Sequence, residues 1–478
     1  MSVKQEILSG VFWSAIQKYS GLIIQILITA ILARLLSPED FGVIAIATVL
    51  IAFFTLFTDM GIGPAIIQNR ELNQKDLDSI FSFSIWGGIV LSLLFFGASY
   101  PIADFYQKES LVFICQILSI NLLFASWNIV PNALINKNKR FKFMAKRTLA
   151  LQITSGSISV FAAYNGFGVY SLLISPIFTA IGIFAFDYRQ YPLHFSLHID
   201  INSLHKIKSF SSFQFLFNFF NYFSRNLDKL IIGRYFSMND LGYYEKSYRL
   251  MLLPINNVTN VISPVMHPIL TSLQDDYKEL TNKYNKIIKL LATISFPLGV
   301  FLYFTAGDII NIIYGHQWAK AIPVFQILAL SLPLQMILST TGAIYQAAGK
   351  TNWLFYGGIS NTCCTVIGFI IAASFFRTIE AMAWAWDITL LVNAIVSYII
   401  LYHIVLKESF IQIIKICITP FIIACIQALF LIVIFDYLPS GTHDFIKLLI
   451  KLFISLIVNG CLIQLLGQYQ LSNLLKRH

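Results

Sequence analysis

Polar and charged residues recur at helical spacing in the stretch 210–233. Gln214, Asn218, Asn221, Arg225 and Lys229 are separated by 4, 3, 4 and 4 residues. On an α-helix this spacing confines them to a stripe about 80° wide. The rest of the stretch is rich in Phe, Leu and Ile. The pattern predicts a helix with one hydrophilic face in apolar surroundings.

Cations dominate this face and its neighbourhood. Apolar stretches of the chain contain six of them, Lys18, Arg225, Lys229, Lys246, Arg249 and Lys451. A charge at the middle of a membrane costs at least ~2.5–3.5 kcal/mol, so each is a functional candidate. Four of these cations lie close in sequence to only two acids, Asp228 and Glu245, which leaves a positive surplus. Because the arginine fork makes two parallel hydrogen bonds to a phosphate, the surplus predicts a chamber that attracts a phosphorylated anion.

Each candidate also has a purely structural interpretation. Arg225 and Asp228 could form a buried ion pair that fixes helix packing, and Glu245 and Arg249 could pair at i, i+4. Lys246 and Arg249 could extend to the membrane interface.

Other charged candidates lie elsewhere. For Lys451, which lies near the C-terminus, extension to the interface is the favoured interpretation. Asp59, in the sequence TDMGIG, is either a gate or a solvated helix end. Asp387 stands alone in its apolar stretch, and an ion-coupling role is the less favoured interpretation of it.

The elements that carry these residues are membrane-spanning helices. Hydrophobic residues make up 57% of the chain and charged ones only 12%, against roughly a quarter in soluble proteins. Apolar runs of about twenty residues recur, each long enough to cross ~30 Å of hydrocarbon as a helix. We therefore predict an all-α polytopic membrane protein with about fourteen spans, at 10–33, 41–63, 79–102, 111–134, 148–164, 169–187, 210–233, 243–263, 287–306, 322–345, 354–375, 380–404, 415–436 and 445–467.

Lysine and arginine are distributed unevenly between alternate loops. One set of loops holds most of the 33 cations; the other holds only Arg34, Lys108, Arg234, Lys320, Arg377 and Lys447. The positive-inside rule then predicts both termini in the cytoplasm. The densest loop, 137–147, is expected to meet anionic headgroups of membrane lipids. The net charge of +10 is thereby explained without a nucleic-acid partner.

An internal repeat is visible at a shift of 200 residues. Arg34, Ser37, Asp40 and Gly42 align with Arg234, Ser237, Asp240 and Gly242. We predict an N-terminal lobe at 1–209, a second lobe at 210–405 that repeats it in parallel, and two additional helices at 406–478. The stripe of the seventh helix corresponds in the first helix to Ser14, Lys18, Gly21, Gln25 and Thr29. Two such faces are what two halves enclosing one hydrophilic path require.

Several of these segments resemble a known family. The sequence LARLLSPEDFG at 32–42 and TDMGIG at 58–63 are similar to the first two helices of polysaccharide flippases. NLDKLIIGR at 226–234, LGYY at 241–244 and YGHQW at 314–318 extend the similarity. The chain resembles the Wzx branch, the O-antigen and colanic-acid exporters, of the multidrug/oligosaccharidyl-lipid/polysaccharide exporter superfamily.

This resemblance implies two lobes around a V-shaped cavity that work by alternating access in a bacterial inner membrane. The implied substrate is an undecaprenyl-diphosphate-linked oligosaccharide for O-antigen, capsule or exopolysaccharide, handed to a polymerase and its chain-length machinery. No cofactor is implied, and coupling to Na⁺ or H⁺ stays open. The diphosphate would meet Lys18, Arg225, Lys229, Lys246 and Arg249. The sugars would meet Ser14, Gln25, Gln214, Asn218 and Asn221. Asp59, Asp228 and Glu245 would serve as gate or ion-pair partners.

Two other functions compete with this one. An ion-coupled multidrug exporter of the same superfamily fits a cationic cavity poorly, because its substrates are usually cations. A membrane polymerase or ligase would need a large outer loop, whereas the longest predicted one is 307–321. The chain also carries no P-loop, GxSxG or HExxH sequence. We therefore expect a carrier rather than an enzyme.

Overall fold

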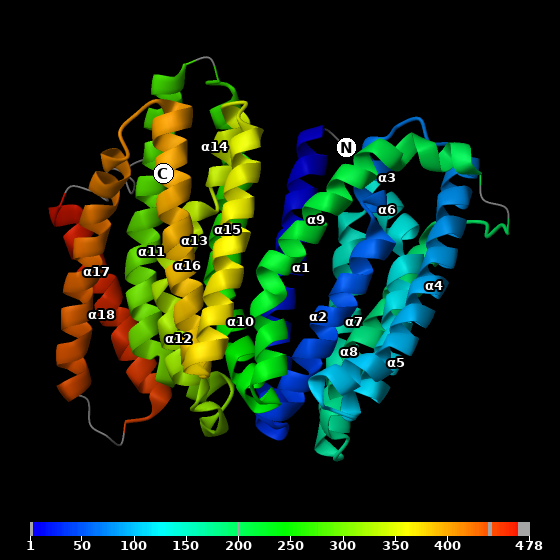
Figure 1. Cartoon of the computed structure of the whole chain (residues 1–478), viewed down its shortest axis with the longest axis horizontal. Coiled ribbons are helices and arrows are strands. Elements are labelled where there is room, and N and C mark those ends of the chain that lie inside the picture. Colours follow the sequence, from blue (N-terminus) through cyan, green and yellow to red (C-terminus); the bar gives the residue numbers. More distant parts are fainter. Residues whose placement is uncertain (1–2, 198–199, 275, 438–441, 467–478) are drawn as a thin grey trace. The chain divides into compact units, whose positions relative to one another are not determined.

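A computed structural model describes residues 3–197, 200–274, 276–437 and 442–466, and its regular structure in these ranges is helical (Figure 1). The chain divides into two compact units, Met1–Gly242 and Tyr243–His478. The helices of the first unit are α1 (Val3–Leu35), α2 (Pro38–Asp59), α3 (Ile62–Gln68), α4 (Gln74–Tyr106), α5 (Ser110–Trp127), α6 (Ile129–Lys137), α7 (Phe141–Tyr164), α8 (Ser171–Gln190) and α9 (Ile201–Tyr235).

Helix α10 (Met238–Thr271) begins in the first unit and continues into the second. The remaining helices of the second unit are α11 (Tyr277–Ile313), α12 (Ala321–Leu330), α13 (Leu332–Leu338), α14 (Thr341–Ala347), α15 (Thr351–Ile371), α16 (Ile379–Ile399), α17 (Ile411–Tyr437) and α18 (Asp444–Leu465). Short π-helical turns extend α15 to Phe376 and α16 to Leu406. The predicted lobe boundaries at 209/210 and 405/406 stay predictions.

The prediction of an all-α polytopic membrane protein is confirmed, but the count of fourteen spans is not. In the described part of the chain, ten helices are long and apolar enough to cross a membrane, or eleven if a bent pair counts as one span. The pair consists of α12 and the segment Leu332–Ala347, which meet at 45°. Helices α7, α9 and α10 are long but fall outside this set. Helices α9 and α10 carry the predicted cations Arg225, Lys229, Lys246 and Arg249.

Three predicted continuous helices are broken in the structure. The range 41–63 ends at Asp59 and resumes as α3, because Met60 and Gly61 adopt left-handed backbone with φ of 39° and 73°. The range 111–134 divides into α5 and α6, and 322–345 into α12, α13 and α14. Prolines lie just after two of the breaks, Pro131 in α6 and Pro333 in α13. Proline has no N–H to donate to the preceding turn, so these positions favour a new helix start.

The two repeat-related junctions form the same local structure. Ser37 precedes α2 and its side chain bonds the backbone N–H of Asp40, while the Asp40 carboxylate accepts from the Ser37 N–H at 2.9 Å. Ser237 and Asp240 make the same reciprocal bonds before α10. Each arrangement satisfies two amide donors at a helix start. The equal cap chemistry supports the predicted repeat.

The starts of α2 and α10 cross backbone to backbone at the repeat-related glycines. A Cβ added to Gly42 would lie 1.8 Å from the Met238 carbonyl oxygen. One added to Gly242 would lie 2.0 Å from the Pro38 oxygen. Only glycine permits such an approach, as at close helix crossings in membranes.

Helix α9 packs along α2 through aromatic side chains and one hydrogen bond. Phe53 of α2 contacts the rings of Phe219, Tyr222 and Phe223, with centroids 5.6–6.2 Å apart. The Tyr222 hydroxyl donates to the Val49 carbonyl at 2.7 Å. This packing holds the cationic part of α9 against α2.

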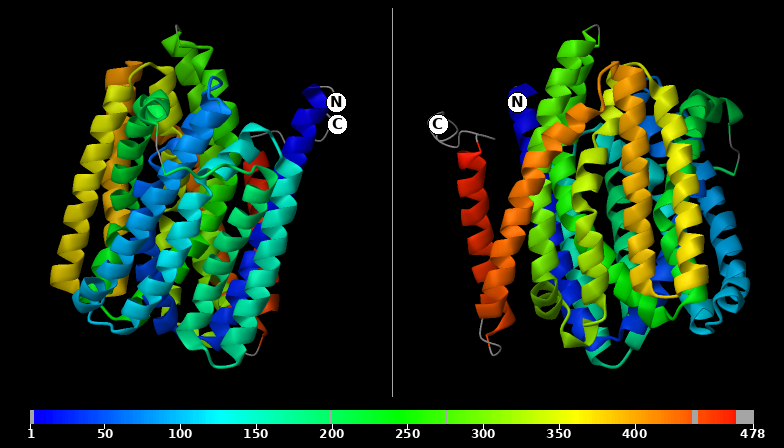
Figure 2. Two further views of the ribbon diagram at one scale, coloured as in Figure 1. Left: turned by 90° about the vertical axis from the view of Figure 1, so that its right-hand side faces the viewer. Right: turned by 60° about the vertical axis from the view of Figure 1, so that its left-hand side comes forward.

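In the second unit, α11 packs against α12, α17 and α18, and the last two lie side by side (Figure 2). Lys451 of α18 is 2% exposed; its ammonium lies 2.6 Å from Asp308 Oδ2 and donates to the Phe304 carbonyl at 3.0 Å. The interpretation that Lys451 extends to the membrane interface is therefore wrong. It anchors the additional C-terminal helix to α11, because a buried charge requires a partner.

Candidate functional site

The predicted polar face of α1 is exposed at three of its four polar or charged positions, and the fourth, Thr29, is half-buried. Ser14, Lys18 and Gln25 are exposed, and the Lys18 ammonium lies 5.8 Å from the centroid of the Tyr19 ring. Gly21 belongs to the face packed on α7, where Gln152 Nε2 donates to its carbonyl at 2.8 Å. Helix α1 also exposes many apolar side chains. Exposure on α1 therefore does not by itself separate a lipid-facing side from a cavity-facing one.

On α9 the three charged residues differ in environment. Arg225 is exposed, Lys229 is half-buried and Asp228 is fully buried. Asp228 Oδ1 accepts the backbone N–H of Lys229 at 2.8 Å. Arg225 is exposed and forms no ion pair with Asp228 in the described part of the chain, so the predicted buried Arg225–Asp228 pair is not found.

The uncharged members of the predicted stripe on α9 are Gln214, Asn218 and Asn221. They lie outside the residues whose side chains the structure describes. Their contribution to a hydrophilic face stays a prediction.

The first turns of α10 bring together the remaining cations. The Arg249 Nε lies 3.1 Å from Glu245 Oε1, which confirms the predicted i, i+4 pair. Lys246 is 4% exposed, so its extension to the interface is wrong. Its ammonium lies 5.6 Å from the centroid of the Tyr314 ring, just beyond α11, within the range of a cation–π contact. Burial raises the pKa of the Tyr314 phenol well above its ordinary value, so the ring facing Lys246 stays neutral.

Two isolated acids were further candidates. Asp59 is half-buried at the end of α2, directly before the left-handed turn at Met60 and Gly61. Asp387 is buried in α16 beside Trp386, whose ring stacks on Phe369. The described residues contain no group of three potential metal-ligating side chains. Gate and ion-coupling roles for these acids stay predictions.

A buried ion pair in the first unit was not predicted from the sequence. Arg147, assigned there to the basic loop, is buried in α7 and its guanidinium pairs with the buried carboxylate of Asp187 in α8. Lys137 of the same loop donates to the Ile66 and Asn69 carbonyls, where α3 ends. A topological signal was available, because Arg147 precedes the predicted fifth helix and Asp187 ends the predicted sixth, at the same end.

Each unit therefore presents its own cluster of charges. In the first unit, Arg225, Asp228 and Lys229 occupy two turns of α9. In the second, Glu245, Lys246 and Arg249 occupy two turns of α10. That these clusters and Lys18 share one chamber stays a prediction.

Similar proteins are known. The lipopolysaccharide biosynthesis protein WzxC of Escherichia coli (strain K12) is 23% identical over 86% of this chain and 84% of its own length. The teichuronic acid biosynthesis protein TuaB of Bacillus subtilis (strain 168) is 25% identical over 84% of each chain. Lipid II flippase MurJ, in its inward closed conformation, has the same fold, with a TM-score of 0.74 and 17% identity over 95% of this chain and 98% of that one.

The family of polysaccharide biosynthesis proteins matches residues 31–323, which is more than half of the sequence. The match contains α2 to α11, with both repeat-related junctions and the charge clusters of α9 and α10. The chain belongs to the polysaccharide biosynthesis protein family.

Proposed function

We propose that this protein is a flippase that moves a lipid-linked oligosaccharide across a bacterial inner membrane during the synthesis of a surface polysaccharide. Membership of the polysaccharide biosynthesis family is the observation that carries this proposal. The names of two relatives, which refer to teichuronic acid and lipopolysaccharide, support it. The substrate we propose is an undecaprenyl-diphosphate-linked repeat unit that moves from the cytoplasmic to the outer leaflet.

The charge chemistry agrees with a diphosphate as the part of the substrate that the protein recognises. Lys18 and Arg225 are exposed, and the Arg249 side chain is about half exposed (51%) despite its bond to Glu245. An arginine can bind a phosphate with two parallel hydrogen bonds, and a lysine acts as a compact point charge. We propose that these three cations contact the diphosphate first.

Transport by alternating access would bring the two polar helix faces to one substrate in turn. Residues such as Ser14 and Gln25 of α1 would face the sugars. A polymerase would consume the product at the outer face and so draw the reaction forward. If an ion contributes, the buried Asp387 is the acid we propose for its coupling.

The decisive experiment measures which leaflet holds the repeat unit. Inner-membrane vesicles of defined orientation would be prepared from the host with and without the gene, and probed with a membrane-impermeant lectin or glycosidase. Trapping of the unit in the cytoplasmic leaflet without the gene supports flipping. An unchanged distribution in a host without a redundant carrier refutes it and favours a multidrug-type exporter.

The role of the exposed cations has its own test. Arg225→Gln and Lys18→Gln should each reduce outward movement of the repeat unit several-fold at unchanged protein level. Lys320→Gln is the matched control, because Lys320 is an exposed cation just before α12, outside the predicted set. Equal transport by all three variants would remove Lys18 and Arg225 from the mechanism and leave the flippase proposal itself standing.

A further inference from the structure

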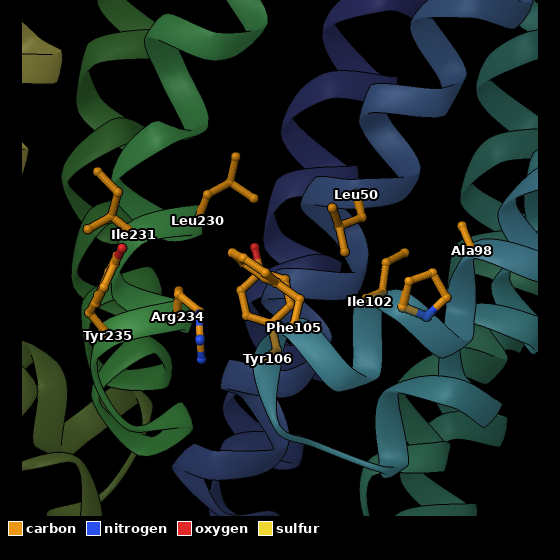
Figure 3. A pocket seen from close by; sticks show the side chains of 10 residues that line it. Leu50, Ala98, Ile102, Phe105, Tyr106, Leu230, Ile231, Arg234 and Tyr235 are labelled. Carbon is orange, nitrogen blue, oxygen red and sulfur yellow. The ribbon is translucent and has the colours of Figure 1, made fainter.

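An apolar groove lies between α2, α4 and α9 of the first unit (Figure 3). Its volume is about 460 Å³, within the range of ligand-binding pockets. Leu50 of α2, Ile102 and Phe105 of α4, and Leu230 and Ile231 of α9 form most of its walls. These walls fit a hydrocarbon chain and offer little to a sugar or another polar solute.

The groove runs from the helix ends into the hydrophobic part of the unit. Ala98, which also lines it, precedes Tyr106 at the end of α4 by eight residues, or about 12 Å along a helix. One leaflet of hydrocarbon is about 15 Å thick, half of a typical bilayer core. The groove is therefore deep enough to follow a lipid chain through most of one leaflet.

A single cation lines the groove, and it is at the end of α9. Arg234 is exposed in the last turn of that helix, and its guanidinium lies 4.9 Å from the centroid of the Phe105 ring (Figure 3). The neighbouring Tyr235 is 72% exposed. Exposed tyrosines and arginines at helix ends mark the level of the lipid headgroups. Arg234 is thus placed for a headgroup while the groove is placed for its chain.

The charges around this end leave Arg234 available. Glu39 pairs with Lys108, and the Asp240 carboxylate bonds Ser237 at the start of α10. Within the described ranges Arg234 forms no ion pair. Its cation–π contact with Phe105 leaves the charge of the guanidinium uncompensated.

We propose that this groove binds one anionic phospholipid of the surrounding membrane, with an acyl chain between α4 and α9 and the phosphate at Arg234. A free phosphate would leave the apolar walls uncovered, and an uncharged lipid would leave the arginine without a counter-ion. Bulk phospholipid is also present in any membrane at far higher concentration than a biosynthetic carrier lipid. In the proposed orientation the site faces the outer leaflet, but lipid binding itself does not depend on the flippase function.

Native mass spectrometry of the purified full-length protein tests this proposal. The protein in mild detergent would be titrated with phosphatidylglycerol and, separately, with phosphatidylcholine of the same acyl chains. The wild type should bind phosphatidylglycerol more tightly. Arg234→Gln should weaken phosphatidylglycerol binding about tenfold, as expected for loss of a charge-assisted hydrogen bond. It should weaken phosphatidylcholine binding less, because the choline cation already balances the charge of that lipid's phosphate.

Two further variants distinguish recognition of the lipid headgroup from binding of the acyl chain. Arg34→Gln is the matched control, because Arg34 is the exposed, repeat-related arginine at the end of α1 and does not line the groove. It should bind both lipids as the wild type does. Ala98→Phe places a ring in the groove and should weaken the binding of both lipids alike. Thermal unfolding would confirm that this variant is folded.

Three results would overturn the proposal. The first is equal affinity of the wild type for the two lipids. The second is a phosphatidylglycerol affinity of Arg234→Gln that matches Arg34→Gln. The third is displacement of phosphatidylglycerol by an equal concentration of a polyprenyl phosphate, which would assign the groove to a carrier lipid instead.

Discussion

Replacing Lys451 by methionine should detach α18 from α11. The ammonium of Lys451 lies 2.6 Å from Asp308 Oδ2 and 3.0 Å from the Phe304 carbonyl oxygen, and the two charged side chains are only 3% and 9% exposed. Methionine has a similar length and no charge. The substitution therefore keeps most of the packing but leaves Asp308 as a buried carboxylate without its cation.

Lys451→Met should lower the free energy of unfolding by a large amount for a single substitution. Removing one partner of a buried ion pair costs about 3–5 kcal/mol, because the remaining charge keeps its desolvation penalty. Removing both partners in Lys451→Met/Asp308→Leu should restore most of this loss, since two apolar side chains need no compensation. The double variant should thus be more stable than Lys451→Met alone.

Equilibrium unfolding in mixed micelles provides the free energies, with helix content measured by circular dichroism. Lys447→Met is the matched control, one turn earlier on α18. Lys447 is 3.9 Å from Asp444 and both side chains are more than a fifth exposed, so the control should change stability by less than about 1 kcal/mol. If Lys451→Met is no less stable than this control, the lysine extends to the interface and the anchoring argument fails.

Three other substitutions probe packing in the first unit, all by thermal unfolding. Gly42→Ala would place a Cβ 1.8 Å from the Met238 carbonyl oxygen and should destabilise by about 3 kcal/mol or more. Gly97→Ala, with nothing within 4 Å, should be neutral or stabilise by up to about 1 kcal/mol; equal effects would refute the close crossing. Tyr222→Phe removes the 2.7 Å bond to the Val49 carbonyl and should cost about 1 kcal/mol. Unchanged stability would show that this bond does not contribute.

Hydropathy predicted the fold well because it is a local property of the chain. In the part of the chain that the structure describes, the predicted ranges fall on helices apart from the breaks above, but several helices extend beyond the predicted boundaries. Helix α10 covers Met238–Thr271, for example, against a predicted 243–263. Helix breaks such as the one between Asp59 and Ile62 were not predicted, because the apolar run continues across the left-handed turn. Hydropathy senses composition and not backbone conformation.

Whether a charged contact could be predicted from the sequence depended on how far apart its two residues lie in the chain. Glu245 and Arg249 are four residues apart, so helical geometry alone predicted their pair. Lys451 and Asp308 lie on α18 and α11, and their pairing depends on tertiary packing that no local pattern encodes. The crossing of α2 and α10 at their glycines could be predicted only in part. The repeat showed that Gly42 and Gly242 are equivalent, but not that the segments around them touch.

The predicted cations differ in exposure, and we expect their roles to differ with it. A residue that contacts the phosphate of the proposed substrate must be exposed, which holds for Lys18 and Arg225. Lys246 is buried against the Tyr314 ring, so removing its charge should affect the packing of α10 before it affects substrate binding. Arg249 is intermediate, because a phosphate must compete with Glu245 for its guanidinium. A carrier benefits from such competition, since an arginine that can return to its own carboxylate releases the substrate more easily than one left without a counter-ion.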